Sequence, residues 1–102
     1  MKKNVLYIDT TDNKRIFVSL NNEEKIEIVS QNQVVKSEHL LPALEKLFKK
    51  AKITPSLLTE IIVNKGPGSY TGIRVGLAVA NAMAFALGIK VNGKKQEVQA
   101  IY

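Results

Sequence analysis

The residues whose types could bind an anion lie in the run 66–72, which reads Gly-Pro-Gly-Ser-Tyr-Thr-Gly. Its backbone amides come just before a predicted helix, where amides without helical partners can hold a phosphate. The Gly-x-x-x-x-Gly-Lys-Ser/Thr spacing of a Walker A loop is absent from the sequence. We therefore interpret this run as a tight strand-to-helix turn with a capping hydroxyl, made by Gly66, Pro67, Gly68, Ser69, Thr71 and Gly72.

Few other residues could support catalysis. Asp9 ends a predicted strand and could orient a metal-bound phosphate, yet a single carboxylate there more often forms a turn. His39 is expected to be a partly exposed structural histidine, and Lys65 an ordinary surface lysine. With no cysteine and one histidine, the chain cannot form a thiolate or multi-histidine metal centre. We predict no catalytic residue, no metal site and no cofactor.

Length and composition indicate one small globular domain. The chain has 102 residues, of which 45% are hydrophobic and 24% charged, close to the averages for folded soluble proteins. Fifteen Lys and Arg against nine Asp and Glu give a net charge of +6, but the lysines are scattered, which favours a solvated surface over nucleic-acid binding. The first apolar run is cut by Asp9 and is too short for a signal peptide, so we expect a cytoplasmic protein.

Hydrophobic periodicity predicts an alternation of strands and helices. Three antiparallel strands are expected first, the earliest of them central and buried on both faces. A helix capped by Ser37 follows, then a helical turn, a strand parallel to the first, and a second helix. Two short strands around a Lys-rich turn are expected last. The predicted elements are residues 5–8, 15–20, 25–30, 37–51, 54–58, 61–64, 71–88, 89–93 and 97–101.

The second helix is apolar nearly all round, since Arg74 and Asn81 are its only strongly polar residues. Small residues at every fourth position allow another backbone to approach closely: Gly72, Gly76, Ala80, Ala84 and Gly88. At 100° per residue, one face, expected to pack on the chain's own sheet, carries Val75, Val79, Ala82, Met83 and Ala86. The other, expected to face a partner because the chain has little left to cover it, carries Arg74, Leu77, Ala78, Asn81 and Phe85.

Two other interpretations of this helix compete with a partner-facing one. A transmembrane span would bring Arg74 and Asn81 into a weakly hydrophobic, alanine-rich segment, and we therefore do not expect a membrane partner. An ordinary buried core helix stays open as the alternative.

Three sequence blocks resemble the bacterial TsaB (YeaZ) family. They are Ile-Asp-Thr-Thr at 8–11, Ser-Glu-His-Leu-Leu-Pro at 37–42, and the highly specific Gly-Pro-Gly-Ser-Tyr-Thr-Gly-Ile-Arg-Val-Gly at 66–76. The resemblance covers about residues 4–91 and implies an α/β fold, a single actin/Hsp70-like (ribonuclease H-like) lobe with a mixed sheet in the order β-β-β-α-β-α-β and two main helices. Residues 1–102 are then one lobe, with 89–102 an atypical strand or hairpin in place of a second lobe.

The resemblance also implies a function. In that family a non-catalytic subunit binds and activates its paralogue TsaD, the transferase that forms N6-threonylcarbamoyladenosine at position 37 of certain tRNAs. The pairing uses the two helices of the first lobe as a four-helix bundle, and the subunit alone can form a homodimer through the same surface. On this basis the partner interface would comprise Leu40, Leu41, Leu44, Leu47, Phe48, Arg74, Leu77, Ala78, Asn81 and Phe85.

The sequence also departs from the family pattern. No second lobe follows, and the His-x-x-x-His metal motif of the TsaD paralogues is absent. The resemblance therefore implies no enzymatic activity, contact with the ATPase TsaE only in a larger complex, and contact with tRNA only indirectly. Met1 and the atypical tail lead us to expect a naturally short chain.

Three alternatives compete with this interpretation. One is a nucleotide-binding or hydrolysing half-domain that uses Asp9 and the glycine-rich run, although it would lack a second lobe to hold an adenosine. Another is a basic tRNA-binding module, whose binding would weaken steeply with salt. The third is a homodimeric structural domain built on the same helices.

Overall fold

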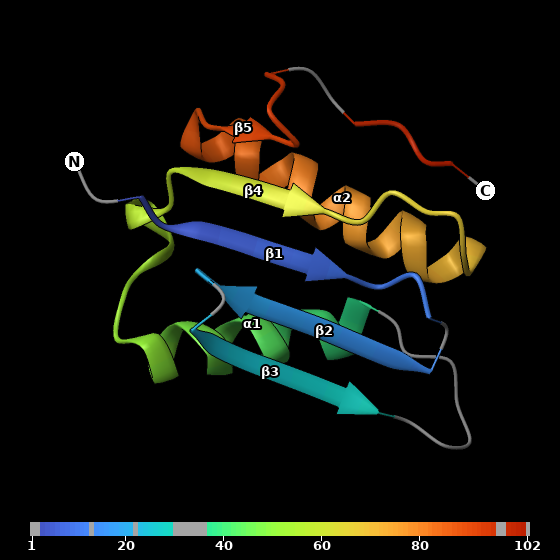
Figure 1. Cartoon of the computed structure of the whole chain (residues 1–102), viewed down its shortest axis with the longest axis horizontal. Coiled ribbons are helices and arrows are strands. Elements are labelled where there is room, and N and C mark those ends of the chain that lie inside the picture. Colours follow the sequence, from blue (N-terminus) through green and yellow to red (C-terminus); the bar gives the residue numbers. More distant parts are fainter. Residues whose placement is uncertain (1–2, 13, 22, 30–36, 96–97, 102) are drawn as a thin grey trace.

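The computed structural model describes residues 3–12, 14–21, 23–29, 37–95 and 98–101. They form one five-stranded sheet with strand order β3-β2-β1-β4-β5 and two long helices (Figure 1). The elements are β1 (Val5–Asp9), β2 (Arg15–Leu20), β3 (Glu24–Val29), α1 (Ser37–Ala51), the 3-10 turn η1 (Pro55–Leu57), β4 (Glu60–Val63), α2 (Tyr70–Leu87) and β5 (Lys90–Val91).

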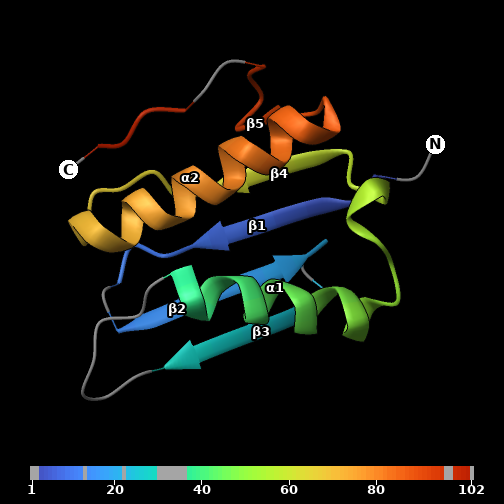
Figure 2. The same cartoon turned by 180° about the vertical axis from the view of Figure 1, so that it is seen from behind.

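Strand β1 lies at the centre of the sheet, as predicted, pairing antiparallel with β2 and parallel with β4. Its side chains alternate, so that Leu6 and Ile8 are fully buried while Tyr7 and Asp9 are half-buried on the other face. The prediction of burial on both faces is wrong because α1 and α2 cover the same face of the sheet (Figure 2).

The helices divide that face between them. Helix α1 packs over β2 and β3, whereas α2 packs over β1, β4 and β5. An apolar stripe of α1 at helical spacing therefore meets the inward side chains of two neighbouring strands. The core between these layers includes Leu6, Ile8, Ile16, Val18, Leu40, Ala43, Leu44, Leu47, Ile61, Val63, Ile73 and Ala80. The predicted cap at Ser37 lies outside the described side chains.

The C-terminal hairpin is the main difference from the predicted elements. Strand β5 has only two residues and pairs with β4, while described residues 98–101 form no strand. Their backbone is engaged elsewhere, because Val98 bonds to Asn81 of α2 and the Ile101 amide donates to the Lys65 carbonyl oxygen at 2.7 Å. The other predicted ends lie within a residue or two of those observed, and the predictions at Ser30 and Glu97 fall outside the described residues.

Among the described residues, α2 is the one helix long and apolar enough, by length and composition, to cross a membrane. In this structure it packs on the sheet and buries Ile73, Leu77, Ala80 and Ala84. Core helices of folded domains can be equally long and apolar, and the inner side of α2 packs as the side of such a helix does.

Candidate functional site

The glycine-rich run connects β4 to α2 and is held by hydrogen bonds within the chain. The Gly66 amide donates to Asn64 Oδ1 at 3.1 Å, and the Ser69 amide donates to the Thr11 carbonyl oxygen at 2.7 Å. Ser69 is the N-cap of α2, since its Oγ accepts a hydrogen bond from the Gly72 amide at 3.3 Å. Three amides that could bind an anion are thus already engaged, which supports the turn interpretation.

Two glycines of α2 lie directly against the residue that follows β1. A Cβ built at Gly72 would overlap the carbonyl oxygen of Thr10, and one at Gly76 would overlap Thr10 Oγ1. The close approach predicted from the small-residue stripe is therefore made within the chain, to the backbone of Thr10 at Gly72 and to its side chain at Gly76. Ala80 and Ala84 are also buried on this side, whereas Gly88 is the left-handed C-cap of α2, and a Cβ built there would meet no atom within 4 Å.

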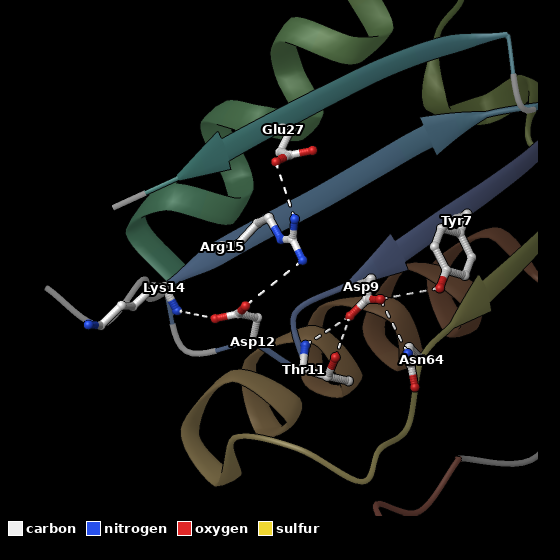
Figure 3. Close-up of polar contacts among 8 residues, drawn as sticks. All are labelled: Tyr7, Asp9, Thr11, Asp12, Lys14, Arg15, Glu27 and Asn64. Atoms are coloured by element: carbon white, nitrogen blue, oxygen red, sulfur yellow. Dashed lines mark hydrogen bonds and ion pairs between the residues drawn. The ribbon is translucent and has the colours of Figure 1, made fainter. Parts of the chain in front are cut away.

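Asp9 sits at the carboxyl end of β1 with four donors around it (Figure 3). Its Oδ1 accepts from the amide and hydroxyl of Thr11 at 3.0 and 2.7 Å, and its Oδ2 accepts from Asn64 Nδ2 at 3.2 Å and the Tyr7 hydroxyl at 3.4 Å. Burial alone would raise the pKa of the Asp9 carboxyl, but these donors outweigh it and hold the pKa below its ordinary value. For Tyr7, burial and the adjacent carboxylate raise the pKa.

These contacts bear on the nucleotide alternative. A carboxylate offers about four lone-pair positions, and the four donors occupy those of Asp9. The adjoining hollow, of about 240 Å³, is lined by Asp9, Asp12, Glu27 and Arg15, so carboxylates outnumber cations in it. Such a hollow repels a phosphate. No group of three or more His, Cys, Asp or Glu able to hold a metal occurs in the described part of the chain.

Helix α1 contributes less exposed surface than expected. Leu40, Leu44, Leu47 and Phe48 are 0 to 8% exposed, because α1 packs on β2 and β3. Of the five α1 residues predicted at the interface, only Leu41 is exposed, at 56%. The other four are buried because α1 is the only described helix over that half of the sheet and packs its apolar stripe there.

Helix α2 does leave an apolar face exposed, but it is rotated from the predicted one. Leu77 is only 7% exposed and adds little to the exposed surface, while Ala82 and Ala86 are exposed instead of packing on the sheet. The rotation follows from the contact of Gly72 and Gly76 with Thr10. We define the α2 face as the exposed residues Arg74, Ala78, Ala82, Phe85 and Ala86.

Phe85 is the most exposed large apolar side chain on this face, at 90%. At the other end, Arg74 lies over the Tyr70 ring, with 5.3 Å from Cζ to the ring centroid, and donates to the Tyr70 hydroxyl at 3.1 Å. A groove of about 770 Å³ borders the α2 face and is walled on its far side by Val98, Gln99 and Ala100. A helix face of small residues ending in one exposed aromatic ring suits a second helix that packs closely against it.

A second groove lies where α1, η1 and α2 meet. It measures about 600 Å³ and is lined by Leu41, Leu44, Glu45, Phe48, Lys49, Lys52, Ile53, Thr54, Pro55, Leu57 and Met83. We call these residues the α1 groove. Leu41 and Leu57 within it are more than half exposed, so the groove presents apolar surface beside the α2 face.

Comparison with known proteins identifies the family that shares this architecture. A family model described as TsaD, tRNA N6-adenosine threonylcarbamoyltransferase, matches residues 27–93. The chain is 33% identical over 90 residues to the tRNA threonylcarbamoyladenosine biosynthesis protein TsaB of Bacillus subtilis, covering 86% of this chain and 39% of the relative. YeaZ from Pseudomonas aeruginosa superposes with a TM-score of 0.74 at 26% identity, over 88% of this chain and 42% of that chain. This chain belongs to the TsaB/YeaZ group of the TsaD family.

A second TsaB protein also matches this chain. TsaB of Buchnera aphidicola subsp. Schizaphis graminum is 36% identical over 69 residues, covering 65% of this chain and 33% of the relative. The chain thus spans about two fifths or less of the length of the TsaB and YeaZ proteins it matches. The mixed sheet with two helices on one face is a single actin-like lobe, as the resemblance implied.

One feature of this TsaB/YeaZ lobe was not anticipated from its sequence. Asn81 was assigned to the partner face, yet its Nδ2 donates to the Val98 carbonyl oxygen at 3.2 Å and its Oδ1 accepts from the Val98 amide at 3.0 Å. The Asn81 side chain thereby forms, with the Val98 backbone, the donor and acceptor pair of hydrogen bonds that a neighbouring strand would form. The signal for this contact was a single asparagine in an otherwise apolar helix stretch, since a half-buried amide needs partners for both its donor and its acceptor.

Proposed function

We propose that this chain is a non-catalytic scaffold subunit that binds the TsaD paralogue through the α2 face and activates N6-threonylcarbamoyladenosine formation on tRNA position 37. The observation that carries the proposal is the α2 face itself, with Phe85 90% exposed beside Ala78, Ala82 and Ala86. The TsaB relatives are named as biosynthesis proteins of this tRNA modification, which supports the assignment of the pathway.

The energetics of the α2 face favour a helical partner. Burying an exposed phenylalanine contributes roughly 1.5–3 kcal/mol, and small residues beside it let a second helix approach to about 8–10 Å between axes. Aromatic and arginine side chains dominate the binding energy of interfaces, and the face has one of each, Phe85 and Arg74. Leu41 in the adjoining α1 groove extends the same apolar surface.

The polar groups of the lobe support a role without catalysis. Asp9 is surrounded by donors from its own chain, and the amides of Gly66, Ser69 and Gly72 are engaged in the turn. These groups hold β1, β4 and α2 together and leave little free hydrogen-bonding capacity for a substrate. In this proposal the chemistry belongs to TsaD, TsaE joins only a larger complex, tRNA is contacted indirectly and the complex is cytoplasmic.

A homodimer through the same helices is the second candidate. The α2 face is apolar and contains no carboxylate, so two copies could pack their α2 helices in an isologous contact. This candidate is compatible with the first when TsaD is absent.

The test is the light-scattering mass of the purified chain, alone and mixed with TsaD from the same source. We expect a stable mixed complex that Ala78→Arg abolishes, because an arginine there blocks close helix packing. Val29→Arg is the matched control, since Val29 is 61% exposed on β3, at the sheet edge away from α2 (Figure 1). A chain that stays monomeric and ignores TsaD contradicts the proposal, as does a complex that both variants leave intact.

A further inference from the structure

We infer that Asn92 is a site of covalent modification, at which deamidation by water converts a side chain that holds β5 to β4 into one that repels it. The site belongs to the turn after β5, at the edge of the sheet, and to neither the α2 face nor the α1 groove (Figure 1). Modification there goes beyond the proposed function and does not depend on it. Of all the asparagines in the chain, Asn92 alone is followed by glycine.

Asn92 and Gly93 are the central residues of a tight turn. Val91 and Lys94 exchange backbone hydrogen bonds of 2.9 and 3.0 Å across it. The φ angles of Asn92 and Gly93 are 51° and 77°, left-handed values at both positions, as in the type I′ turn that Asn-Gly favours. Gly93 is exposed, a Cβ built there would meet no atom within 4 Å, and its amide donates no hydrogen bond in the described part of the chain. Its nitrogen is therefore unhindered and not engaged.

The Asn92 side chain continues the pairing of β5 with β4 beyond the end of β5. Its Oδ1 accepts a hydrogen bond from the Val63 amide at 2.8 Å, and its Nδ2 donates to the Val63 carbonyl oxygen at 3.0 Å. The Asn92 backbone amide donates to the Ile61 carbonyl oxygen at 2.8 Å. We call the two side-chain hydrogen bonds to Val63 the Asn92 clamp, since they take the place of the next residue of a very short strand.

The reaction needs only the neighbouring amide and water. The Gly93 nitrogen loses its proton to solvent and attacks Asn92 Cγ. The bond from Cγ to Nδ2 then breaks, and the departing nitrogen takes up a proton and leaves as ammonia. Water adds to either carbonyl of the resulting succinimide and opens the ring to aspartate or isoaspartate, so that one water is consumed for each ammonia released. The Val63 amide already points at Oδ1, where negative charge develops during the attack, and so stabilises the intermediate.

The product cannot restore the Asn92 clamp. One oxygen of the new carboxylate can still accept from the Val63 amide, but the other lies where Nδ2 donated, against the Val63 carbonyl oxygen. Two acceptors at that distance repel each other, so a contact that closed the end of β4 becomes one that opens it. In isoaspartate the backbone of the turn is also longer by one carbon. Each event removes one unit from the net charge of +6.

The first experiment follows deamidation of the purified chain by peptide mass spectrometry at pH 8.5 and at pH 6. We expect the peptide with Asn92 to gain about 1 Da, faster at pH 8.5 because the attacking nitrogen must lose a proton. Asn64 is the internal control, since its side-chain amide also donates one hydrogen bond and accepts another, but lysine follows it. It should react at least about tenfold more slowly, because a Cβ on the following residue hinders the attack. Equal rates at Asn92 and Asn64 overturn the inference.

The second experiment measures the consequence with Asn92→Asp, which carries the product carboxylate. The Val63 amide should exchange with deuterium at least about tenfold faster than in the wild type at pH 7, measured by NMR. The urea midpoint should be lower than that of the wild type at pH 7. This difference should narrow on acidification, since a protonated carboxyl can donate to the Val63 carbonyl oxygen as Nδ2 does.

Asn92→Ala is the matched control, because it removes the Asn92 clamp without adding a charge. Its urea midpoint should also be lower than that of the wild type, but acidification should not narrow the difference. An Asn92→Asp protein as stable at pH 7 as the wild type, with Val63 exchanging no faster, overturns the inference, as does a difference that narrows equally for both variants.

Discussion

Thr10 Oγ1 donates a hydrogen bond of 2.5 Å to the carbonyl oxygen of Gly72, joining residues 62 positions apart in the chain. Thr10 is 1% exposed and fills the space that side chains at Gly72 and Gly76 would need. The contact ties the end of β1 to the first turn of α2. It thereby sets the rotation of α2 about its axis, and this rotation decides which residues form the α2 face.

Replacing Gly76 by alanine tests this contact. In an exposed helix the change stabilises by roughly 1 kcal/mol, but here the new Cβ overlaps Thr10 Oγ1. Overpacking of this kind costs about 1–3 kcal/mol, so we expect Gly76→Ala to lower the free energy of unfolding in urea. The same Gly76→Ala change should cost less free energy of unfolding in a Thr10→Ala protein, because the hydroxyl that the new Cβ overlaps is then absent. A Gly76→Ala protein more stable than the wild type contradicts the packing described.

The Asp9 hydrogen bonds predict a dependence of stability on pH. Because the folded pKa of Asp9 lies below its ordinary value, its contribution is present above about pH 4 and is lost as the pH falls through the folded pKa. Asp9→Asn should lose about 1–3 kcal/mol at pH 7, since the amide cannot accept from all four donors. Its stability should also fall less than that of the wild type on acidification, as measured by urea unfolding between pH 7 and pH 3. Equal acid dependence in both proteins argues against this role.

A variant at Phe85 can distinguish an effect on partner binding from an effect on folding. Since its side chain is 90% exposed, Phe85→Ala should change the free energy of unfolding by no more than about 0.5 kcal/mol. We expect the affinity for TsaD to fall at least about tenfold, measured by calorimetric titration. Leu77→Ala is the contrasting variant, because Leu77 is buried and its truncation should cost about 2–5 kcal/mol in stability. Unchanged affinity in Phe85→Ala would place the partner on another surface.

Asn81 predicts a local effect at the C-terminal segment. Asn81→Ala removes both hydrogen bonds to Val98, each worth roughly 1 kcal/mol. The Val98 amide should then exchange with deuterium about tenfold faster or more, measured by NMR. Gln99→Ala is the control, since the Gln99 side chain is exposed and makes no described hydrogen bond. Unchanged exchange at Val98 in Asn81→Ala would show that the segment is held by other contacts.

The order of the elements could be predicted from sequence because it depends on local patterns. The apolar run at Leu6 and Ile8 marked the central strand, and the short apolar run at Ile61 after a helix marked its parallel neighbour. The cap at Ser69 followed from a hydroxyl just before an apolar helix. The family resemblance, which comparison has shown, came from a glycine block whose glycines at 72 and 76 are required by the contact with Thr10.

The rotation and partners of the helices were decided only by the tertiary structure. Helix α2 is apolar all round, so its periodicity could not show which side would meet the sheet, and the contact with Thr10 turned Leu77 inward and Ala82 outward. For α1, the apolar stripe fixed a buried face but could not tell a core contact from a partner contact. The prediction of a C-terminal strand was wrong for a similar reason, because the period-two pattern could not reveal that Asn81 would bind Val98. A sequence pattern specifies which side chains leave water, whereas packing decides what they meet.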